Sequence, residues 1–188
     1  ETVRLTSAGD VNDYFLRGEG VVFSALREKK DKETAEKGVP LTVLQLLPYS
    51  GGEAREWLRL PYRVSDIRFI TSDRFIFSAS YSHDYAAALA ECGGDAEKAA
   101  ARVKENADYR VVDELPYRFN GAGYINKQRT RLYLYDAGRV TPITDEWTNV
   151  SPGALSDDGK RLYFTASRYE DVSQIFDRLF ELNTETLE

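Results

Sequence analysis

The triplet Phe23-Ser24-Ala25 recurs in this sequence as Phe77-Ser78-Ala79 and again as Phe164-Thr165-Ala166. Each copy closes a short run of apolar and aromatic residues, which is typical of a β-strand. A self-similar pattern with a period of tens of residues indicates that one supersecondary unit is repeated along the chain. The repeat therefore decides the fold, and the elements around it show what each unit contains.

A second landmark precedes each triplet at nearly constant distance. It lies 12, 13 and 14 residues before the phenylalanine, as Val11-Asn12-Asp13, Val64-Ser65-Asp66 and Val150-Ser151-Pro152. Turn-forming residues occupy the interval in every copy, at 18–20, 72–73 and 156–159. Each unit therefore begins with a predicted strand, a tight turn and a second strand.

More strands are predicted after each triplet. Apolar stretches follow at Leu41–Leu47, Leu132–Tyr135 and Leu179–Leu182, and in the first two units a glycine turn leads to a further strand at 56–60 and at 140–144. Units of about 40 to 50 residues with four strands are typical of a propeller blade. We predict an all-β fold, a β-propeller fragment of roughly three four-stranded blades. A β-sandwich is the rival architecture, but it does not require the same pattern three times.

The copies are unequally spaced because of an insertion. Phe23 and Phe77 are 54 residues apart, whereas Phe77 and Phe164 are 87 residues apart. The additional residues fall in the second unit, where 85–107 is rich in Ala, Glu and Lys and is broken by Gly93-Gly94. This composition predicts two helices, in an insertion at about 84–112 of the second blade. The same position in the first unit, Arg27–Gly38, is predicted to be a charged loop.

These patterns divide the chain into blades. Residues 9–61 and 62–148 are expected to form two blades, and 149–188 an incomplete blade that ends after its third strand near Leu182. Residues 1–8 are expected to end a preceding blade, with its outermost strand at Val3–Thr6. Both ends of the chain are thus expected to lie within a blade. The sequence contains no methionine, so Glu1 is not expected to be a translation start. Either the chain is an excised piece, or methionines are missing from the sequence as written.

The bulk composition is that of an ordinary globular protein. Of 188 residues, 42% are hydrophobic and 30% are charged, with 25 basic and 31 acidic residues and a net charge of −6. Neither sign of charge forms a long block, and no apolar run approaches the roughly 20 residues that cross a bilayer. We expect no nucleic-acid and no membrane partner. The single cysteine, Cys92, cannot form an internal disulfide, which favours a reducing compartment such as the cytoplasm.

Two phrases carry a resemblance to a known family. The first runs through Asp113-Glu114-Leu115-Pro116-Tyr117-Arg118-Phe119-Asn120-Gly121, Gly123-Tyr124 and Arg131-Leu132-Tyr133-Leu134-Tyr135-Asp136. The second is 155–167, a hairpin whose variants occur in many unrelated propellers. The first phrase is the more specific. Together they resemble the propeller of the prolyl oligopeptidase family of serine peptidases, with the acylaminoacyl peptidase and bacterial dipeptidyl peptidase branches most similar.

The resemblance implies a function for the parent protein. In that family the propeller precedes an α/β-hydrolase domain with a Ser, Asp and His triad, and it admits peptides while it excludes folded proteins. The Gly-x-Ser-x-Gly run that exposes such a serine does not occur here. We therefore expect no catalytic residue, no cofactor and no metal ligand in this chain, and a gating role for it. Tyr169-Glu170-Asp171 matches only weakly the paired-glutamate motif of dipeptide-releasing members. A stand-alone propeller that binds a protein or small ligand is the alternative.

The resemblance also implies partners for this chain. The expected ones are the remaining blades and the hydrolase domain of the parent chain, together with a peptide substrate. Blades protect their apolar faces by packing around an axis, and three blades cannot close. Self-association of the fragment is therefore also expected.

Two residues invite a functional interpretation. His83 is the only histidine and stands beside Asp84, as a general base with its carboxylate would, although an ordinary loop histidine is the simpler interpretation. Arg118 is expected to return from the insertion toward the central channel. There it either binds a peptide carboxylate or ties two blades together.

Three further stretches are assigned to the surface. The carboxylate-rich segments Glu28–Glu36 and Asp95–Glu105 lack calcium-loop spacing and are expected to be solvated and salt-bridged. Ala99, Ala100 and Val103 share one face of a predicted helix. That face either packs against its own blade or docks on a partner.

Overall fold

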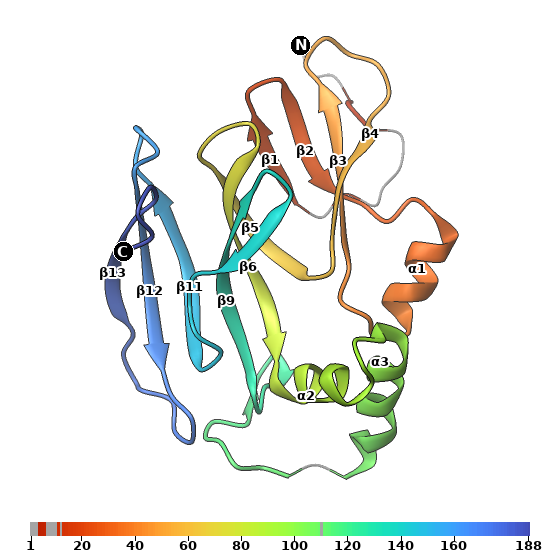
Figure 1. Cartoon of the computed structure of the whole chain (residues 1–188), viewed down its shortest axis with the longest axis vertical. Helices are drawn as coiled ribbons and strands as arrows, with labels where there is room; N and C mark the ends of the chain where they lie inside the picture. Colours follow the sequence, from red (N-terminus) through yellow and green to blue (C-terminus); the bar gives the residue numbers. More distant parts are fainter. Residues whose placement is uncertain (1–3, 7–10, 12, 110) are drawn as a thin grey trace.

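Three antiparallel sheets lie side by side along the chain (Figure 1). The computed structural model describes residues 4–6, 11, 13–109 and 111–188. The first sheet has four strands in sequence order, β1 (Tyr14–Arg17), β2 (Gly20–Ser24), β3 (Thr42–Pro48) and β4 (Arg55–Leu60). Every connection within this sheet joins neighbouring strands, so it is a simple meander.

The second sheet repeats this order and contains the insertion. Its strands, from one edge to the other, are β5 (Arg63–Phe69), β6 (Arg74–Ser82), β9 (Gln128–Asp136) and β10 (Arg139–Pro142). Between β6 and β9 the chain leaves the sheet to form two helices and a separate short hairpin of β7 (Arg118–Phe119) and β8 (Gly123–Tyr124). β6 and β9 nevertheless pair along their whole length, from Arg74 with Asp136 to Ser82 with Gln128. The insertion thus leaves the sheet intact.

The third sheet has three strands in the described part of the chain, β11 (Thr148–Leu155), β12 (Arg161–Arg168) and β13 (Arg178–Asn183). A bulge in β11 shifts its register against β12 between Ser151 and Ala154. Gly153 lies in this bulge, where an added Cβ would stand 1.7 Å from the carbonyl oxygen of Tyr163. Only a glycine allows the two strands to approach so closely.

The repeated triplet occupies the same place in every sheet. Phe23, Phe77 and Phe164 lie in the second strands β2, β6 and β12, and all three are buried. Phe77 packs in the cluster between the first and second sheets, and Phe164 in the cluster between the second and third. Phe23 belongs to a separate cluster on the far side of the first sheet. Each phenylalanine therefore points toward the preceding position in the stack, as the repeat predicts.

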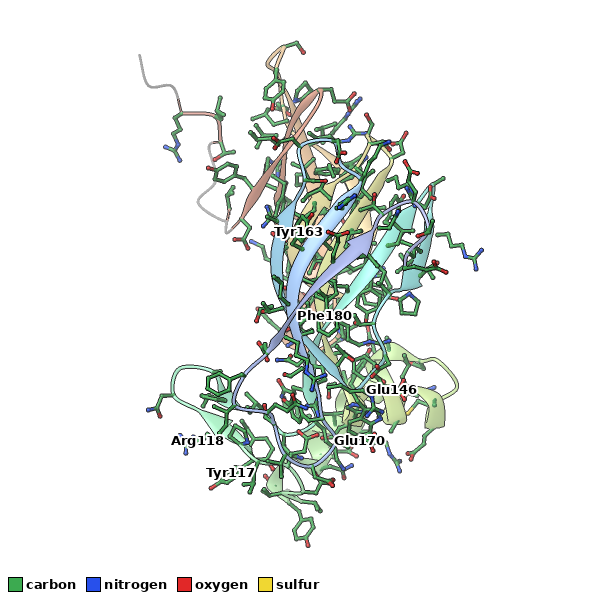
Figure 2. All side chains as sticks on the ribbon, turned by 90° about the vertical axis from the view of Figure 1, so that its left-hand side faces the viewer. Tyr117, Arg118, Glu146, Tyr163, Glu170 and Phe180 are labelled. Atoms are coloured by element: carbon green, nitrogen blue, oxygen red, sulfur yellow. The ribbon has the colours of Figure 1, made fainter. Side chains whose placement is uncertain are left out.

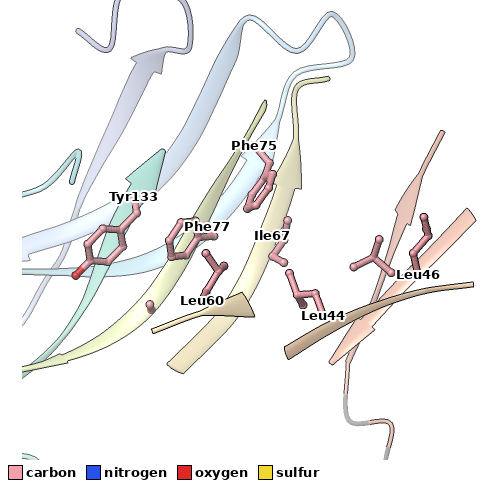
Figure 3. Close-up of a cluster of buried hydrophobic side chains, with 9 residues drawn as sticks. Leu44, Leu46, Leu60, Ile67, Phe75, Phe77 and Tyr133 are labelled. Atoms are coloured by element: carbon pink, nitrogen blue, oxygen red, sulfur yellow. The ribbon is translucent and has the colours of Figure 1, made fainter. Parts of the chain in front are cut away.

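Aromatic rings fill the space between the first two sheets (Figure 3). Phe75 stacks on Tyr135 at 4.6 Å between ring centroids, and Phe77 stacks on Tyr133 at 5.2 Å. Leucines of the first sheet close the cluster from the other side. Burial raises the pKa of Tyr133 to about 12. The junction is therefore a continuous apolar core that holds the two sheets together.

The helices gather at one end of the sheets (Figure 1). α1 (Lys29–Glu36) lies in the connection from β2 to β3, whereas α2 (His83–Glu91), α3 (Ala96–Glu105) and the 3-10 turn Asn106–Asp108 lie between β6 and β9. The two predicted helices of the insertion are confirmed, with the break at Gly93-Gly94. Both glycines have positive φ angles, which favour glycine because it lacks a Cβ. None of the helices in the described ranges has the length and apolar character needed to cross a membrane.

Two expectations about local structure are wrong. The segment 27–38 is not a loop, because 29–36 form α1, which is fixed to β4 by an ion pair between Arg59 and Asp31. The strand expected at Val3–Thr6 is not formed by the part of it that the structure describes. Val3 lies outside the described residues, and Arg4–Thr6 are not in a strand, since no strand within the described chain pairs with them. Asn12 of the first landmark also lies outside the described residues.

Candidate functional site

The end of the molecule that carries the insertion contains several buried polar side chains. Glu114 lies in the segment that returns from α3, and Arg129 is the second residue of β9, where it pairs with Tyr81 of β6. The side chains of Glu114 and Arg129 are 1% and 0% exposed. The two form a bidentate ion pair in which Arg129 Nη2 donates to Glu114 Oε1 at 2.7 Å and Nη1 donates to Oε2 at 3.1 Å. A buried charge pair is tolerated only when its remaining polar atoms are also satisfied.

Arg129 meets that condition with all five of its N–H groups. Besides Glu114, it donates to the backbone carbonyl oxygens of Trp147 at 3.2 Å, Gln128 at 2.9 Å and Tyr169 at 3.0 Å. Its guanidinium also lies 3.8 Å from the centre of the Tyr169 ring. Trp147 precedes the third sheet and Tyr169 follows β12. Arg129 therefore ties the second sheet to the third, and it has no donor left for a ligand.

Asn126 fixes the segment 111–114 at the same end of the molecule. Its side-chain oxygen accepts hydrogen bonds from the backbone N–H groups of Asp113 at 3.4 Å and Glu114 at 3.2 Å. Its amide nitrogen donates to the Val111 carbonyl at 3.2 Å and to the Asp113 carboxylate at 3.1 Å. Because Asn126 is buried, it fixes the incoming chain at 111–114 against the start of β9.

The hairpin β7-β8 rises from this fixed base. Leu115 donates its N–H to the Asp171 carbonyl at 2.8 Å, and Ser173 donates to the Leu115 carbonyl at 2.7 Å. These two bonds join the return segment to the loop between β12 and β13. At the neck of the hairpin, the Ile125 N–H donates to the Tyr117 carbonyl at 2.9 Å. The hairpin is thus anchored on both sides of its base.

His83 and Asp84 do not form a catalytic pair. His83 is the first residue of α2 rather than a loop residue, and its Nε2 lies 3.0 Å from the Glu146 carbonyl oxygen. The ring stacks on Trp147 at 3.9 Å. Burial lowers the pKa of His83, and the charges that act on it belong to Arg129, Glu146 and Glu114. Asp84 acts on Lys127 instead. His83 therefore serves the contact between α2 and the third sheet.

Arg118 does not tie two blades together. It lies in β7, its side chain is exposed, and Figure 2 shows it with Tyr117 at the lower left, away from Glu146 and Glu170. Among the residues that the structure describes, its guanidinium makes no hydrogen bond or ion pair. The arginine that performs the expected linking role is Arg129. Whether Arg118 faces a central channel stays a prediction.

The remaining sequence candidates have structural roles. Glu170 pairs with Arg168 at 2.8 Å, and the backbone of Asp171 accepts the Leu115 hydrogen bond. Glu170 and Asp171 therefore take part in separate contacts. Asp31 is buried rather than solvated, and its Oδ1 accepts from Arg59 at 2.6 Å. No group of three metal-ligating side chains occurs within the ranges that the structure describes.

α3 packs on helices instead of on its own sheet. Ala99 and Ala100 are buried and Val103 is half-buried. α2 lies against α3, and Lys37, just after α1, pairs with Glu97 at 2.8 Å. We expected this helix face to pack against its own blade. In the structure α3 packs instead against α2, the other helix of the insertion, and contacts the end of α1. The insertion thus connects the first two sheets at this end.

A pocket of about 610 Å³ opens between the helices and the return segment. Ala87, Ala88 and Val103 form its helical wall, and Tyr124 and Asn126 lie opposite. Of its charged side chains, Arg102 pairs with Glu91 and Lys127 pairs with Asp113, and Asp84 also lines the pocket. Among the described residues that line the pocket there is no histidine and no cysteine, and no sequence pattern predicted the pocket.

Comparison with known proteins connects this geometry to one architecture. No family model matches the sequence, and no curated protein matches it. The solved structures that match in fold include the acylaminoacyl peptidase of Pyrococcus horikoshii and an acylaminoacyl peptidase in complex with Z-Gly-Gly-Phe-chloromethyl ketone. Each superposes with a TM-score of 0.56 and 11% identity over 93% of this chain. The chain spans 24% of the length of each. This likeness confirms the all-β propeller-fragment fold.

Proposed function

We propose that this chain is a non-catalytic propeller segment of a serine peptidase that acts on short peptides, such as an acylaminoacyl or oligopeptide hydrolase. In that role it limits access to a separate α/β-hydrolase domain. The observation that carries the proposal is the fold likeness to acylaminoacyl peptidase over 93% of the chain. The residue arrangement supports it, because the buried polar groups of the insertion end join sheets and leave no activated nucleophile in the part of the chain described.

The rest of the parent protein is the partner that this proposal requires. It comprises further blades, the hydrolase domain and a peptide substrate. The single cysteine is free and half-buried, which supports a reducing compartment such as the cytoplasm.

A fluorophosphonate probe tests the assignment to a serine peptidase. We expect the intact polypeptide that contains this chain to react with the probe, because an activated serine attacks the phosphorus of such a probe, displaces fluoride and becomes phosphonylated. Peptide mapping should place the label outside residues 1–188. A label on one of the serines of this chain would contradict the non-catalytic role, and an unlabelled intact polypeptide would contradict the peptidase assignment.

The gating role has its own test. The intact polypeptide should hydrolyse short N-acylated peptides and leave a folded protein substrate intact. Cleavage of short peptides and of folded protein at equal rates would contradict a filter. A disulfide-free, unfolded protein of the same length serves as the control for sequence preference.

A further inference from the structure

We propose that the β7-β8 hairpin is a carboxylate-binding element, with Arg118 as the group that contacts the ligand. The inference rests on the proposed function for its ligand class, which is a short peptide. Arg118 is a free cation at an exposed position, and its side chain has no partner within the described residues. A guanidinium can accommodate a carboxylate with two parallel hydrogen bonds.

Within the described residues, Arg55, Arg139 and Arg178 are exposed and, like Arg118, make no side-chain hydrogen bond or ion pair. Arg68, Arg161 and Arg168 lie on strands and are each paired with a carboxylate. Arg118 differs from all of these in its sequence neighbours, because it is flanked along the chain by two exposed aromatic residues, Tyr117 and Phe119. Exposed aromatic side chains beside a cation are characteristic of contact surfaces rather than of solvated surface.

The hairpin is held firmly enough to present this arginine. The hydrogen bonds of Leu115 and Ile125 fix its base, and Arg118 itself is paired in register with Tyr124. The buried Glu114–Arg129 pair lies directly behind the base. A ligand that binds Arg118 would therefore not have to order the hairpin backbone, which lowers the entropic cost of binding.

Apolar surface beside the hairpin suits the rest of such a ligand. Leu115 forms a parallel bridge with Val172, and both side chains are exposed. Ile175 and Phe176 follow on the same loop and are among the most exposed apolar residues of the chain. The structure thus combines one unpaired cation with neighbouring apolar side chains. The ligand that fits this combination is a peptide whose carboxylate is flanked by apolar residues.

Steady-state hydrolysis by the intact polypeptide tests the role of Arg118. The substrates are an N-acetylated peptide ending in phenylalanine with a free carboxylate, its C-terminal amide, and an amide that carries glutamate in place of an alanine. In Arg118→Gln we expect the KM of the free acid to rise about tenfold with kcat unchanged, because a hydrogen bond to a charged group is lost. The plain amide should be unaffected.

The glutamate-bearing amide separates two sources of the carboxylate. A rise in its KM would show that acidic side chains are recognised, and an unchanged KM would restrict recognition to the peptide terminus. Arg139→Gln is the matched control, since Arg139 is an exposed arginine at the opposite end of the second sheet. An equal rise for the free acid and the plain amide, or an unchanged KM for both carboxylate-bearing peptides, would overturn the inference.

A binding measurement keeps this test independent of the proposed function. If the intact polypeptide hydrolyses none of the peptides, the peptidase assignment fails, and fluorescence anisotropy of the same labelled peptides then decides the role of Arg118. Weaker binding of the free acid to Arg118→Gln than to wild type supports the site. Equal binding by both overturns it.

Discussion

The second and third sheets differ in the burial of one equivalent residue of the repeat, which is covered in the second sheet and exposed in the third. Leu132 on β9 and Leu179 on β13 are each paired with the hydroxyl residue of the triplet, Ser78 and Thr165. Leu132 is 2% exposed, because the third sheet covers it, whereas Leu179 is 73% exposed. Leu44, the equivalent residue of the first sheet, is 1% exposed. The register of each sheet is thus set locally, and the next sheet determines whether a position becomes core.

The next position on the same face of each sheet, two residues further along the strand, also differs between the covered sheets and the third sheet. Leu46 and Leu134 are buried on the first and second sheets, but the equivalent residue on β13 is Glu181, which pairs with Arg161 at 3.3 Å. The uncovered face is therefore part apolar and part charged. A covered face has to exclude water completely, whereas this one is compatible with solvent or with a weakly packed neighbour.

The largest effect is expected from truncating the equivalent leucines of the second sheet, where the position is covered, and of the third sheet, where it is exposed. Leu132→Ala should lower the free energy of unfolding by about 4 kcal/mol, because it removes a buried side chain and leaves a cavity. Leu179→Ala should change it by no more than about 0.5 kcal/mol. Chemical denaturation of the two variants measures the difference. Equal losses in both variants would mean that the third sheet has a covering layer that the comparison omits.

A second test compares a buried ion pair with an exposed one. Glu114→Gln leaves the buried Arg129 without its charged partner, and it should cost about 3 kcal/mol of unfolding free energy. Glu181→Gln, on the uncovered face, removes an exposed pair and should cost less than about 1 kcal/mol. The double variant Glu114→Gln with Arg129→Met should regain part of the loss, since no unpaired charge remains. If Glu114→Gln and Glu181→Gln lower the unfolding free energy equally, burial does not determine the strength of these ion pairs.

The uncovered face also predicts self-association of the chain when it is produced alone. Exposed Leu179 and Tyr163 lie on the outer face of the third sheet, next to the edge strand β13. An apolar face and an unpaired edge favour contact with a second copy. Sedimentation velocity should show a concentration-dependent dimer or larger species, and Leu179→Lys should weaken the association about tenfold. A wild-type chain that stays monomeric at all concentrations would contradict this prediction.

Much of the fold could be predicted because the repeat is local. The triplets mark the second strand of each sheet, and Gly93-Gly94 divides the insertion into its two helices. α1 could not be predicted in the same way, because 29–36 is highly charged and lacks an apolar stripe. Its position depends on long-range contacts such as Arg59 with Asp31, and these are not visible in a pattern of neighbouring residues.

The candidate site was predicted less well, for the same physical reason. Glu114 and Arg129 are separated by fifteen residues and join only because β9 returns beside the insertion. Single-sequence patterns do not show such a pairing. Glu114 does lie within the phrase that carries the family resemblance, and a buried role for an acidic residue there would have been the available signal. His83, by contrast, was a candidate because it is the sole histidine and stands beside Asp84, which its contacts in the fold do not support as a pair.

The smallest expected effect concerns His83, which belongs to the covered junction between the second and third sheets. Its folded pKa lies below the ordinary value of 6.5, chiefly because burial disfavours the charged ring. The unfolded chain therefore binds a proton first as the pH falls. The contribution of His83 to stability is complete above about pH 6.5 and is lost progressively at lower pH, toward the folded pKa. Only a small change follows, because the ring is half-buried.

The measurement compares wild type with His83→Gln, which cannot titrate. Unfolding free energies at about pH 7.5 and about pH 5 should fall more in wild type than in the variant, since other titrating groups are common to both. The uncovered face provides the control, because Leu179→Ala should leave the pH dependence of wild type unchanged. A pH dependence that is identical in wild type and His83→Gln would mean that the ring is as accessible in the folded chain as in the unfolded one. The stacking of His83 on Trp147 would then not persist in solution.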